Sequence, residues 1–362
     1  MFIGSAFSAL WIIIANSWMQ TPGGAELADE GTRAVLTNFF AAAFNPSTLT
    51  RYSHVICAVL IMGAFMTMAV AAWYMHKKDH EKFALRAMKI GSIVATISCA
   101  CMLVTAHSSA VVVSEEQPTK FAMMEGMYED EVPPLYAIGW VDEANEQVIA
   151  PFAIPGGTSF LATGNWDTEY QGLNSLAETE DYSAIDPETM PVNLVFQSYH
   201  LMVAMFGLMA LTLLLALIFT FKGGSIKKMR WLQWLIIISP IFAVLAIQSG
   251  WATAEFGRQP WVVYPSVTGP EGVELLTADG ISLAVSGWEL IATIVLFVLI
   301  YLVLFIAWAR IVARFIKQGP TQEQPAPVAA SSNSFMSGTP PAKAANASPN
   351  DETAPAATKE GE

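Results

Sequence analysis

Six apolar stretches, each long enough to cross a bilayer as a helix, constrain this 362-residue chain more than any other feature. The hydrocarbon core of a bilayer is about 30 Å thick and requires roughly 20 apolar residues in a helix. The stretches are 2–19, 50–75, 88–113, 193–221, 231–254 and 284–312. Only 14% of the residues are charged, against about a quarter in soluble proteins. The sequence therefore predicts an all-α integral membrane protein, a bundle of about six transmembrane helices.

The charges between these stretches are sorted by sign, and this predicts the topology. Basic residues concentrate in three places, 76–89, 222–230 and 310–317. The segment 114–192 instead holds sixteen Asp or Glu and a single Lys. Positive charge marks the cytoplasmic side of a membrane protein. We therefore expect the C-terminus to be cytoplasmic and three segments to face outward: 21–49, 114–192 and 255–283.

The same pattern divides the chain into four parts. Residues 1–113 hold three predicted helices, 114–192 form a long acidic loop, and 193–317 hold three more helices. The remainder, 318–362, is rich in Pro, Ala, Ser and Asn. A segment with so few large apolar residues cannot offset its chain entropy, so we expect a disordered tail. No phosphate-binding loop and no nucleic-acid-binding patch occurs in the sequence.

Two side chains inside the apolar stretches are candidate haem ligands. Ionisable groups at membrane depth are costly and mark functional sites. At about 1.5 Å per helical residue, His54 lies roughly 10 Å and Met202 roughly 15 Å below the outer surface. The two can therefore face one haem iron, and a His/Met pair raises the haem potential. His200 is about 200° from Met202 on its helix, so both cannot bind the same iron. Packing between helices is the alternative explanation for each residue.

Three charged residues outside the apolar stretches have two interpretations. Glu255 closes the fifth stretch and is either an interfacial carboxylate paired with Arg258 or a haem ligand or proton acceptor, with Arg258 holding a propionate. Lys120 is the single cation of the acidic loop, and Glu125 follows five residues later. These two residues are either solvated or positioned to orient a quinol and accept its proton.

Five segments in this order carry a family resemblance: GSAFSALWIIIANSWMQTP (4–22), NPSTLTRYSHV (45–55), QPTKFAMMEG (117–126), YHLMV (199–203) and GWATAEFGRQPW (250–261). The last is the most specific, because GRQPW begins two residues after Glu255, which ends a span. The chain resembles subunit I of the cytochrome bd quinol oxidases over about 1–317. What remains outside the resemblance is the tail.

The resemblance implies roles for individual residues. His54 and Met202 would be the axial ligands of a low-spin b haem, and Glu255 would bind one of two high-spin haems. Lys120 and Glu125 would form the quinol site in the outer loop.

Four further positions follow from the same comparison. Trp251 and Arg258 would line the haem cluster, and Ser8 lies where the family has a polar residue on a proton path. His200 occupies a position where many members have Arg, so its effect on the haem potential is open.

By resemblance, the cofactors are a low-spin haem b, a high-spin haem b, and either haem d or a second high-spin b haem. The complex would sit in the bacterial inner membrane, oxidise quinol at the periplasmic face and reduce oxygen to water with cytoplasmic protons, which is electrogenic. A second, haem-free membrane subunit of the oxidase is the expected partner, besides membrane lipid.

Family subunits have about nine spans, and by the resemblance this chain would begin partway through the fourth. We therefore expect the first span to be cut, three to four spans to be missing, and the chain alone not to reduce oxygen. The sequence fits an incomplete reading frame, which we favour, or one half of a split subunit that pairs with a separate N-terminal half. Two other functions stay open: a b-haem electron-transfer anchor without oxygen chemistry, and a haem-free membrane assembly subunit.

Overall fold

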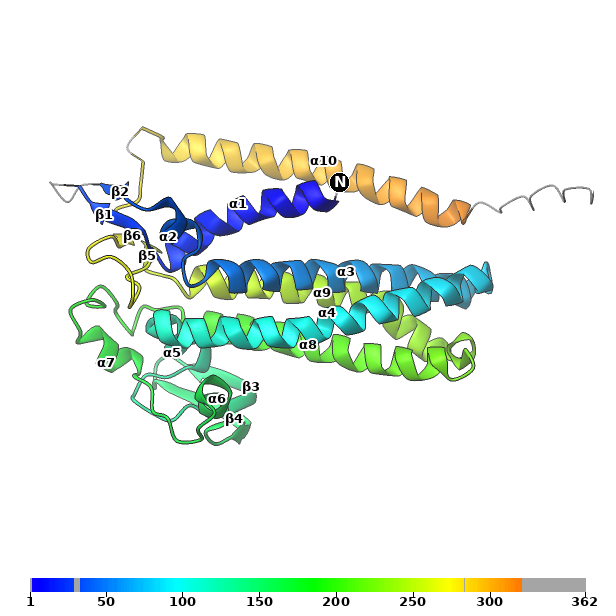
Figure 1. The fold of residues 1–362 in the computed structure, drawn as a ribbon, viewed down its shortest axis with the longest axis horizontal. Helices are drawn as coiled ribbons and strands as arrows, with labels where there is room; N and C mark the ends of the chain where they lie inside the picture. The colour runs from blue at the N-terminus through cyan, green and yellow to red at the C-terminus, as the bar shows by residue number, and fades with distance from the viewer. Residues whose placement is uncertain (1, 29–32, 283, 321–362) are drawn as a thin grey trace, which may run out of the picture. The chain divides into compact units, whose positions relative to one another are not determined.

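The computed structural model describes residues 2–28, 33–282 and 284–320 (Figure 1). Six long helices occur where the six apolar stretches predict them. They are α1 (Phe2–Gln20), α3 (Thr48–Lys77), α4 (Glu81–Glu116), α8 (Val192–Phe221), α9 (Arg230–Phe256) and α10 (Gly287–Gln318). The tail predicted for 318–362 lies outside the described residues from 321 onward.

Five helical segments in the described ranges are long and apolar enough to cross a membrane. They contain α3, α4, α8, α9 and α10. The helix α1 has 19 residues and is not among the five. The predicted class of helical, multi-pass membrane protein is confirmed, with five qualifying spans where about six were predicted.

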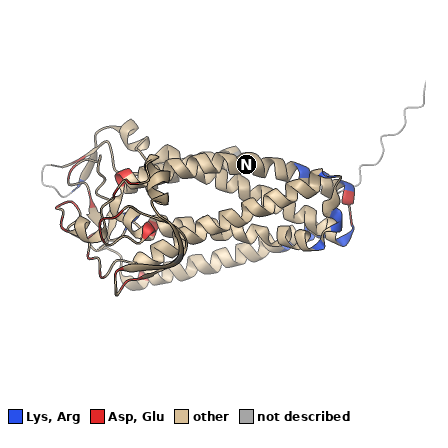
Figure 2. Ribbon diagram, turned by 90° about the horizontal axis from the view of Figure 1, so that it is seen from below, with Lys and Arg blue, Asp and Glu red and all other residues tan. Residues whose placement is uncertain are grey.

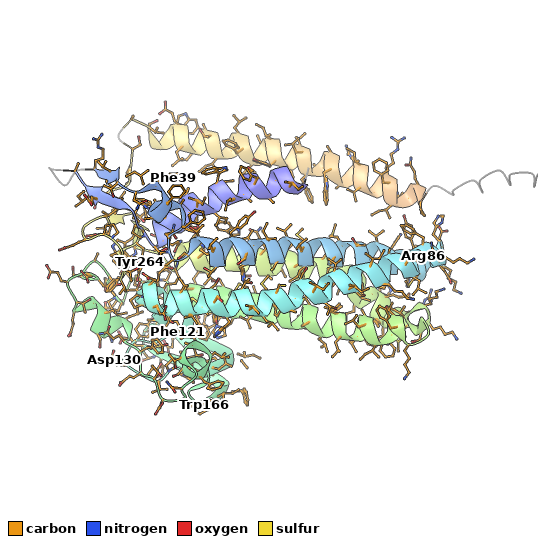
Figure 3. The ribbon with its side chains drawn as sticks, in the orientation of Figure 1. Phe39, Arg86, Phe121, Asp130, Trp166 and Tyr264 are labelled. Atoms are coloured by element: carbon orange, nitrogen blue, oxygen red, sulfur yellow. The ribbon has the colours of Figure 1, made fainter. Side chains whose placement is uncertain are left out.

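Charged residues gather at the two opposite ends of the bundle (Figure 2). Most Lys and Arg lie at one end, here named the basic end, where Arg86 is seen in Figure 3. Asp and Glu concentrate in the segments at the other end, here named the acidic end, together with Asp130. The described residues thus have the charge separation that the topology argument requires.

Short elements fill the acidic end, and the sequence analysis predicted none of them. Three antiparallel pairs of strands form there, β1 with β2, β3 with β4, and β5 with β6. The strands are β1 (Ala25–Leu27), β2 (Ala34–Leu36), β3 (Leu135–Asp142), β4 (Gln147–Ile154), β5 (Trp261–Val263) and β6 (Leu275–Leu276). The short helices are α2 (Phe39–Ala43), α5 (Pro118–Glu125), α6 (Gly157–Thr163) and α7 (Leu173–Ala177). A 3₁₀ turn, η1 (Ser225–Lys228), joins α8 to α9.

Two hydrophobic clusters hold the helices together. The first lies between α3, α4, α8 and α9 and includes Phe65, Met68 and Met88, all fully buried. The second lies at the acidic end and joins α5 to the start of α8 through Phe121 and Phe196. By contrast, α10 buries none of its residues within the described part of the chain. It touches α3 through a hydrogen bond of 2.7 Å from the Tyr74 hydroxyl to the Ile316 carbonyl.

The break between α4 and α5 positions the residues of the candidate site. Gln117 leaves the helical conformation, and Pro118 begins α5, where its missing N–H is tolerated. Gly126 ends α5 with a φ of 74°. A Cβ there would lie 2.6 Å from a Val148 methyl group of β4. Glycine therefore permits both the left-handed turn and the close contact with the strand pair.

Gly91 of α4 should be essential for the contact between α3 and α4. An added Cβ would lie 2.8 Å from Met68 Cγ and 3.3 Å from the Ala64 carbonyl oxygen. We expect Gly91→Val to destabilise the protein by about 1–3 kcal/mol, the usual cost of overpacking. The measurement is the thermal unfolding midpoint in detergent. Gly63→Val on α3 is the control, because nothing lies within 4 Å of its added Cβ. Equal midpoints for the two variants would contradict this packing argument.

Candidate active site at the acidic end

Two cavities of about 290 and 340 Å³ lie among α3, α4, α8 and α9 toward the acidic end. His54 of α3 and Met202 of α8 line both of them. The structure therefore brings these two residues, 148 positions apart in the chain, to one shared wall. Cavities of this size, mostly apolar with a few polar groups, are typical ligand sites.

Gly250 of α9 leaves space for the side chain of Met202. A Cβ on Gly250 would lie 2.9 Å from the Met202 sulfur. The next residue, Trp251, lines the same first cavity and is 36% exposed. The Nδ1 atom of His54 is buried and has no hydrogen-bond partner among the described residues. The wall shared by the two cavities thus carries the His54 imidazole and the Met202 thioether. Neither group forms a hydrogen bond within the described residues.

A chain of polar contacts runs beside the first cavity from α3 to the end of α9. Arg51 Nη2 donates to Asn16 Oδ1 at 2.6 Å, and Asn16 Nδ2 donates to Glu255 Oε1 at 3.0 Å. Arg258 Nη2 donates to Glu255 Oε2 at 2.6 Å. The interfacial Glu255–Arg258 pair, one of the two interpretations of these residues, is therefore present. Glu255 does not line either cavity, whereas Arg51 lines the first.

Both arginines retain unused donors. Arg51 Nη1, Arg258 Nε and Arg258 Nη1 are buried without a hydrogen-bond partner within the described ranges. A buried guanidinium donor without a partner is costly. The region beside the first cavity therefore favours an anionic ligand with acceptor oxygens, such as a carboxylate.

Lys120 is buried against the first cavity. Its Nζ donates to Gln117 Oε1 at 2.9 Å and to Gln20 Oε1. Burial lowers the pKa of Lys120 well below its ordinary value, the positive charges of Arg51 and Arg258 lower it further, and Glu255 opposes them. Lys120 is therefore a buried amine held by two side-chain amides, and it is not solvated.

Glu125 lies on the other side of α5 and lines the second cavity. It is 1% exposed, and the Thr158 hydroxyl of α6 donates to its Oε2 at 3.1 Å. Burial raises the pKa of Glu125 to about 8, while the Thr158 hydrogen bond lowers it and Glu131 raises it. Five helical residues correspond to about 140° of rotation, which explains why Lys120 and Glu125 line different cavities.

Like Glu255 and Arg258, His200 and Ser8 from the sequence analysis line neither cavity. His200 Nδ1 is 2.8 Å from the Phe196 carbonyl oxygen of its own helix, and its ring stacks on Phe196 with centroids 3.9 Å apart. His200 and Met202 therefore point to different sides of α8, as their spacing predicts. Ser8 is exposed on α1.

The sequence analysis missed several polar residues that complete the site. Asn16 belongs to the first apolar stretch and Gln20 follows it directly. Arg51 is the second residue of the second stretch, and Thr158 lies in the acidic loop. Asn16, Gln20 and Arg51 follow the rule that polar groups at membrane depth mark sites. For Thr158 the sequence held no signal, because its role depends on how α6 folds against α5.

The chain matches a known protein family over most of its length. The model of the family described as cytochrome bd terminal oxidase subunit I matches residues 1–320. The chain belongs to this family. It is 28% identical to cytochrome bd-II ubiquinol oxidase subunit 1 of Escherichia coli, over 89% of this chain and 72% of that protein. It is 29% identical to cytochrome bd ubiquinol oxidase subunit 1 of Bacillus subtilis, over 92% of this chain and 69% of that protein.

A solved structure agrees. The bd oxidase of Geobacillus thermodenitrificans matches with a TM-score of 0.70 and 27% identity, over 88% of this chain and 68% of that one. The predicted family and class, a haem-bearing quinol oxidase subunit that acts within a complex, are confirmed. Membership implies haem cofactors and a multi-pass protein of the bacterial inner membrane.

The raised pKa of Glu125 should make the stability of this cytochrome bd subunit depend on pH. The folded protein retains a proton at Glu125 up to about pH 8, whereas the unfolded chain releases it near 4.5. This contribution to the free energy of unfolding is therefore full below the lower value and is lost as pH rises through the higher one.

We expect Glu125→Gln to flatten the fall in thermal unfolding midpoint between about pH 5 and about pH 9. The exposed Glu188, replaced by Gln, is the control and should keep the wild-type slope. A Glu125→Gln profile parallel to wild type would show that Glu125 does not titrate in this range.

Proposed function

We propose that the wall shared by the two cavities would hold a low-spin b haem of this quinol oxidase subunit, with His54 and Met202 as the residues that would bind its iron. The observation that carries the proposal is that both residues line both cavities. No group of three or more His, Cys, Asp or Glu able to hold a metal ion occurs among the described residues. A His/Met pair on a haem iron requires no such group.

The donors around the first cavity fit a haem. Its two carboxylates require cationic or N–H partners, and Arg51 and Arg258 have buried donors that no described protein atom occupies. Gly250 leaves room beside the Met202 sulfur, and Trp251 adds an aromatic surface to the same cavity. When bound, the haem supplies one-electron transfer. The residues of the chain hold it, exclude water and set the charge around it.

The second cavity is the proposed quinol site, and Glu125 is its base. A quinol that becomes a quinone loses two electrons and two protons. A bound haem would supply the electron acceptor, and the second proton would be released to the outer aqueous phase. The Glu125 carboxylate accepts one of the protons, and Thr158 orients it through the hydroxyl bonded to Oε2. A pKa of about 8 suits this role, because a general base works best near the operating pH. Lys120 faces the first cavity, so we propose that it positions Gln20 and Gln117 there.

The remaining assignments rest on the family resemblance and on charge. Glu255 is proposed as ligand of a high-spin haem, with haem d or a b haem completing the oxygen site. Oxygen is reduced to water in a complex with a second, haem-free subunit. The basic end is proposed to be cytoplasmic, which places the C-terminus inside and both cavities near the periplasm.

Replacement of His54 tests the haem assignment. His54→Ala should abolish the low-spin b band in a reduced-minus-oxidised visible spectrum of the purified complex, because the iron loses an axial ligand. The control is His76→Ala on the same helix near the basic end, where the ring contacts Gln233 at 3.2 Å. An unchanged band in His54→Ala would remove this residue from the ligand set.

Replacement of Glu125 tests the quinol site separately. Glu125→Gln should slow quinol oxidation by about a hundredfold, the scale of a lost general base, with haem content retained. Oxygen uptake with quinol as donor gives the rate, and the visible spectrum gives the haem content. Glu188→Gln should keep the wild-type rate. Wild-type turnover in Glu125→Gln would exclude this carboxylate from the mechanism.

A further inference from the structure

The β3–β4 strand pair has one buried face and one strongly apolar exposed face. Val141 is 2% exposed, and an added Cβ on Gly139 would lie 3.0 Å from the Phe196 ring, so this face packs on α8. The opposite face carries two cross-strand pairs, Ile138 with Phe152 and Trp140 with Ile149. These four side chains are 56–71% exposed. An exposed patch of large apolar groups indicates a contact surface.

The strand pair lies beside the first turns of a membrane-spanning helix. Gln197 Nε2 of α8 donates to the Gly139 carbonyl at 2.8 Å, and the Val141 N–H donates to Asn193 Oδ1 at 3.1 Å. From Val141 to Gly139, β3 therefore runs alongside α8 from Asn193 to Gln197, one turn further into the helix. Figure 1 shows β3 and β4 at the same end of the bundle as α5 and α6. The exposed face is thus located where α8 enters the bilayer.

Polarity changes along the strand pair in the direction that a membrane surface requires. The turn at 143–146 holds Glu143 and Glu146, and Asp142 precedes it. This turn lies at the start of α8, because the Asn193 N–H donates to Glu143 Oε1 at 2.8 Å. From Val141 back to Leu135, and from Val148 to Ile154, the strands carry no charge. The charged turn of the strand pair therefore lies at the start of α8, and the uncharged strands extend from it alongside the helix.

The helix that follows β4 also exposes large apolar side chains. Phe160 of α6 and Trp166 stack with ring centroids 4.6 Å apart, and they are 41% and 55% exposed. Leu161 is 51% exposed. Aromatic rings, Trp above all, concentrate at the membrane–water interface, where an apolar body meets a polar surrounding.

We propose that the β3–β4 strand pair and α6 rest in the interfacial layer of the membrane leaflet at the acidic end, with the apolar face against lipid. The layer is interfacial because a two-stranded sheet has free backbone edges, which the hydrocarbon core does not tolerate. Two backbone groups of β3 are satisfied by Asn193 and Gln197 of α8. Water and lipid head groups are available to the rest. The inference requires that α8 spans the membrane, and it does not depend on the haem or quinol assignments.

A photo-crosslinking experiment on the full chain in bacterial membranes tests the proposal. Benzoylphenylalanine is placed singly at Phe152, at Asn145 in the acidic turn, and at Leu201, a 42% exposed residue of α8. After irradiation, mass spectrometry detects peptides that carry a covalently attached phospholipid. We expect an adduct yield at Phe152 several times that at Asn145 and comparable to that at Leu201.

The same probe at Ile138, the cross-strand partner of Phe152, provides a second site if one variant does not fold. Thermal unfolding midpoints close to wild type show that the variants are folded. Lipid adducts at Phe152 or Ile138 no more frequent than at Asn145 would overturn the proposal. Crosslinks that go mainly to a protein chain would also overturn it, because the face would then be covered by protein.

Discussion

The lack of water inside a bilayer is the constraint on which this structure depends. Each polar group within the bundle needs a partner from the protein or from a ligand. Most polar side chains of the helices meet this need locally, as when the Thr212 hydroxyl bonds to the Leu208 carbonyl one turn earlier. Buried hydroxyls without a described partner include Thr220 near the basic end, whereas the buried nitrogen atoms without one, on His54, Arg51 and Arg258, all lie near the acidic end. The unpaired buried nitrogen atoms of the described residues are therefore concentrated at one place.

The short helix α5 divides that place into two chemical environments. It is a separate helix because Gln117 breaks α4, and it ends at Gly126 because β4 approaches closely there. With the helix fixed at both ends, its rotation directs Lys120 to one cavity and Glu125 to the other. The charges of two arginines act on Lys120, whereas a single hydroxyl contacts the carboxylate in the second cavity. The pKa values of the two groups shift in opposite directions chiefly because burial disfavours the charged form of each, and the arginine charges lower the pKa of Lys120 further.

Much of the membrane-embedded fold was predictable, because hydropathy and charge determine the spans and their direction. All six predicted stretches are helical, including α9 with Pro240 inside it. The shared position of His54 and Met202 followed from depth alone, since both helices start at the same end. The contacts of Lys120 were not predictable, because Gln20 and Gln117 come from segments about 100 residues apart that only the tertiary fold brings together. The short strands of the acidic loop were missed because they have no uniform alternation of apolar and polar residues.

The composition of the acidic loop, residues 114–192, does not indicate which of its residues are buried. Sixteen acidic residues suggest a fully solvated segment, yet the loop buries Glu125 and supplies Leu135, Thr158 and Leu161 to the wall of the second cavity. The acidic side chains concentrate in turns such as 142–146, and the strands between them are apolar. On the proposal that Glu125 is the base of a quinol site, a quinol in the second cavity would lie among aliphatic side chains such as Leu135 and Leu161, with the Glu125 carboxyl in the same cavity wall. An acidic loop can therefore supply a largely uncharged binding surface that carries one buried carboxyl group.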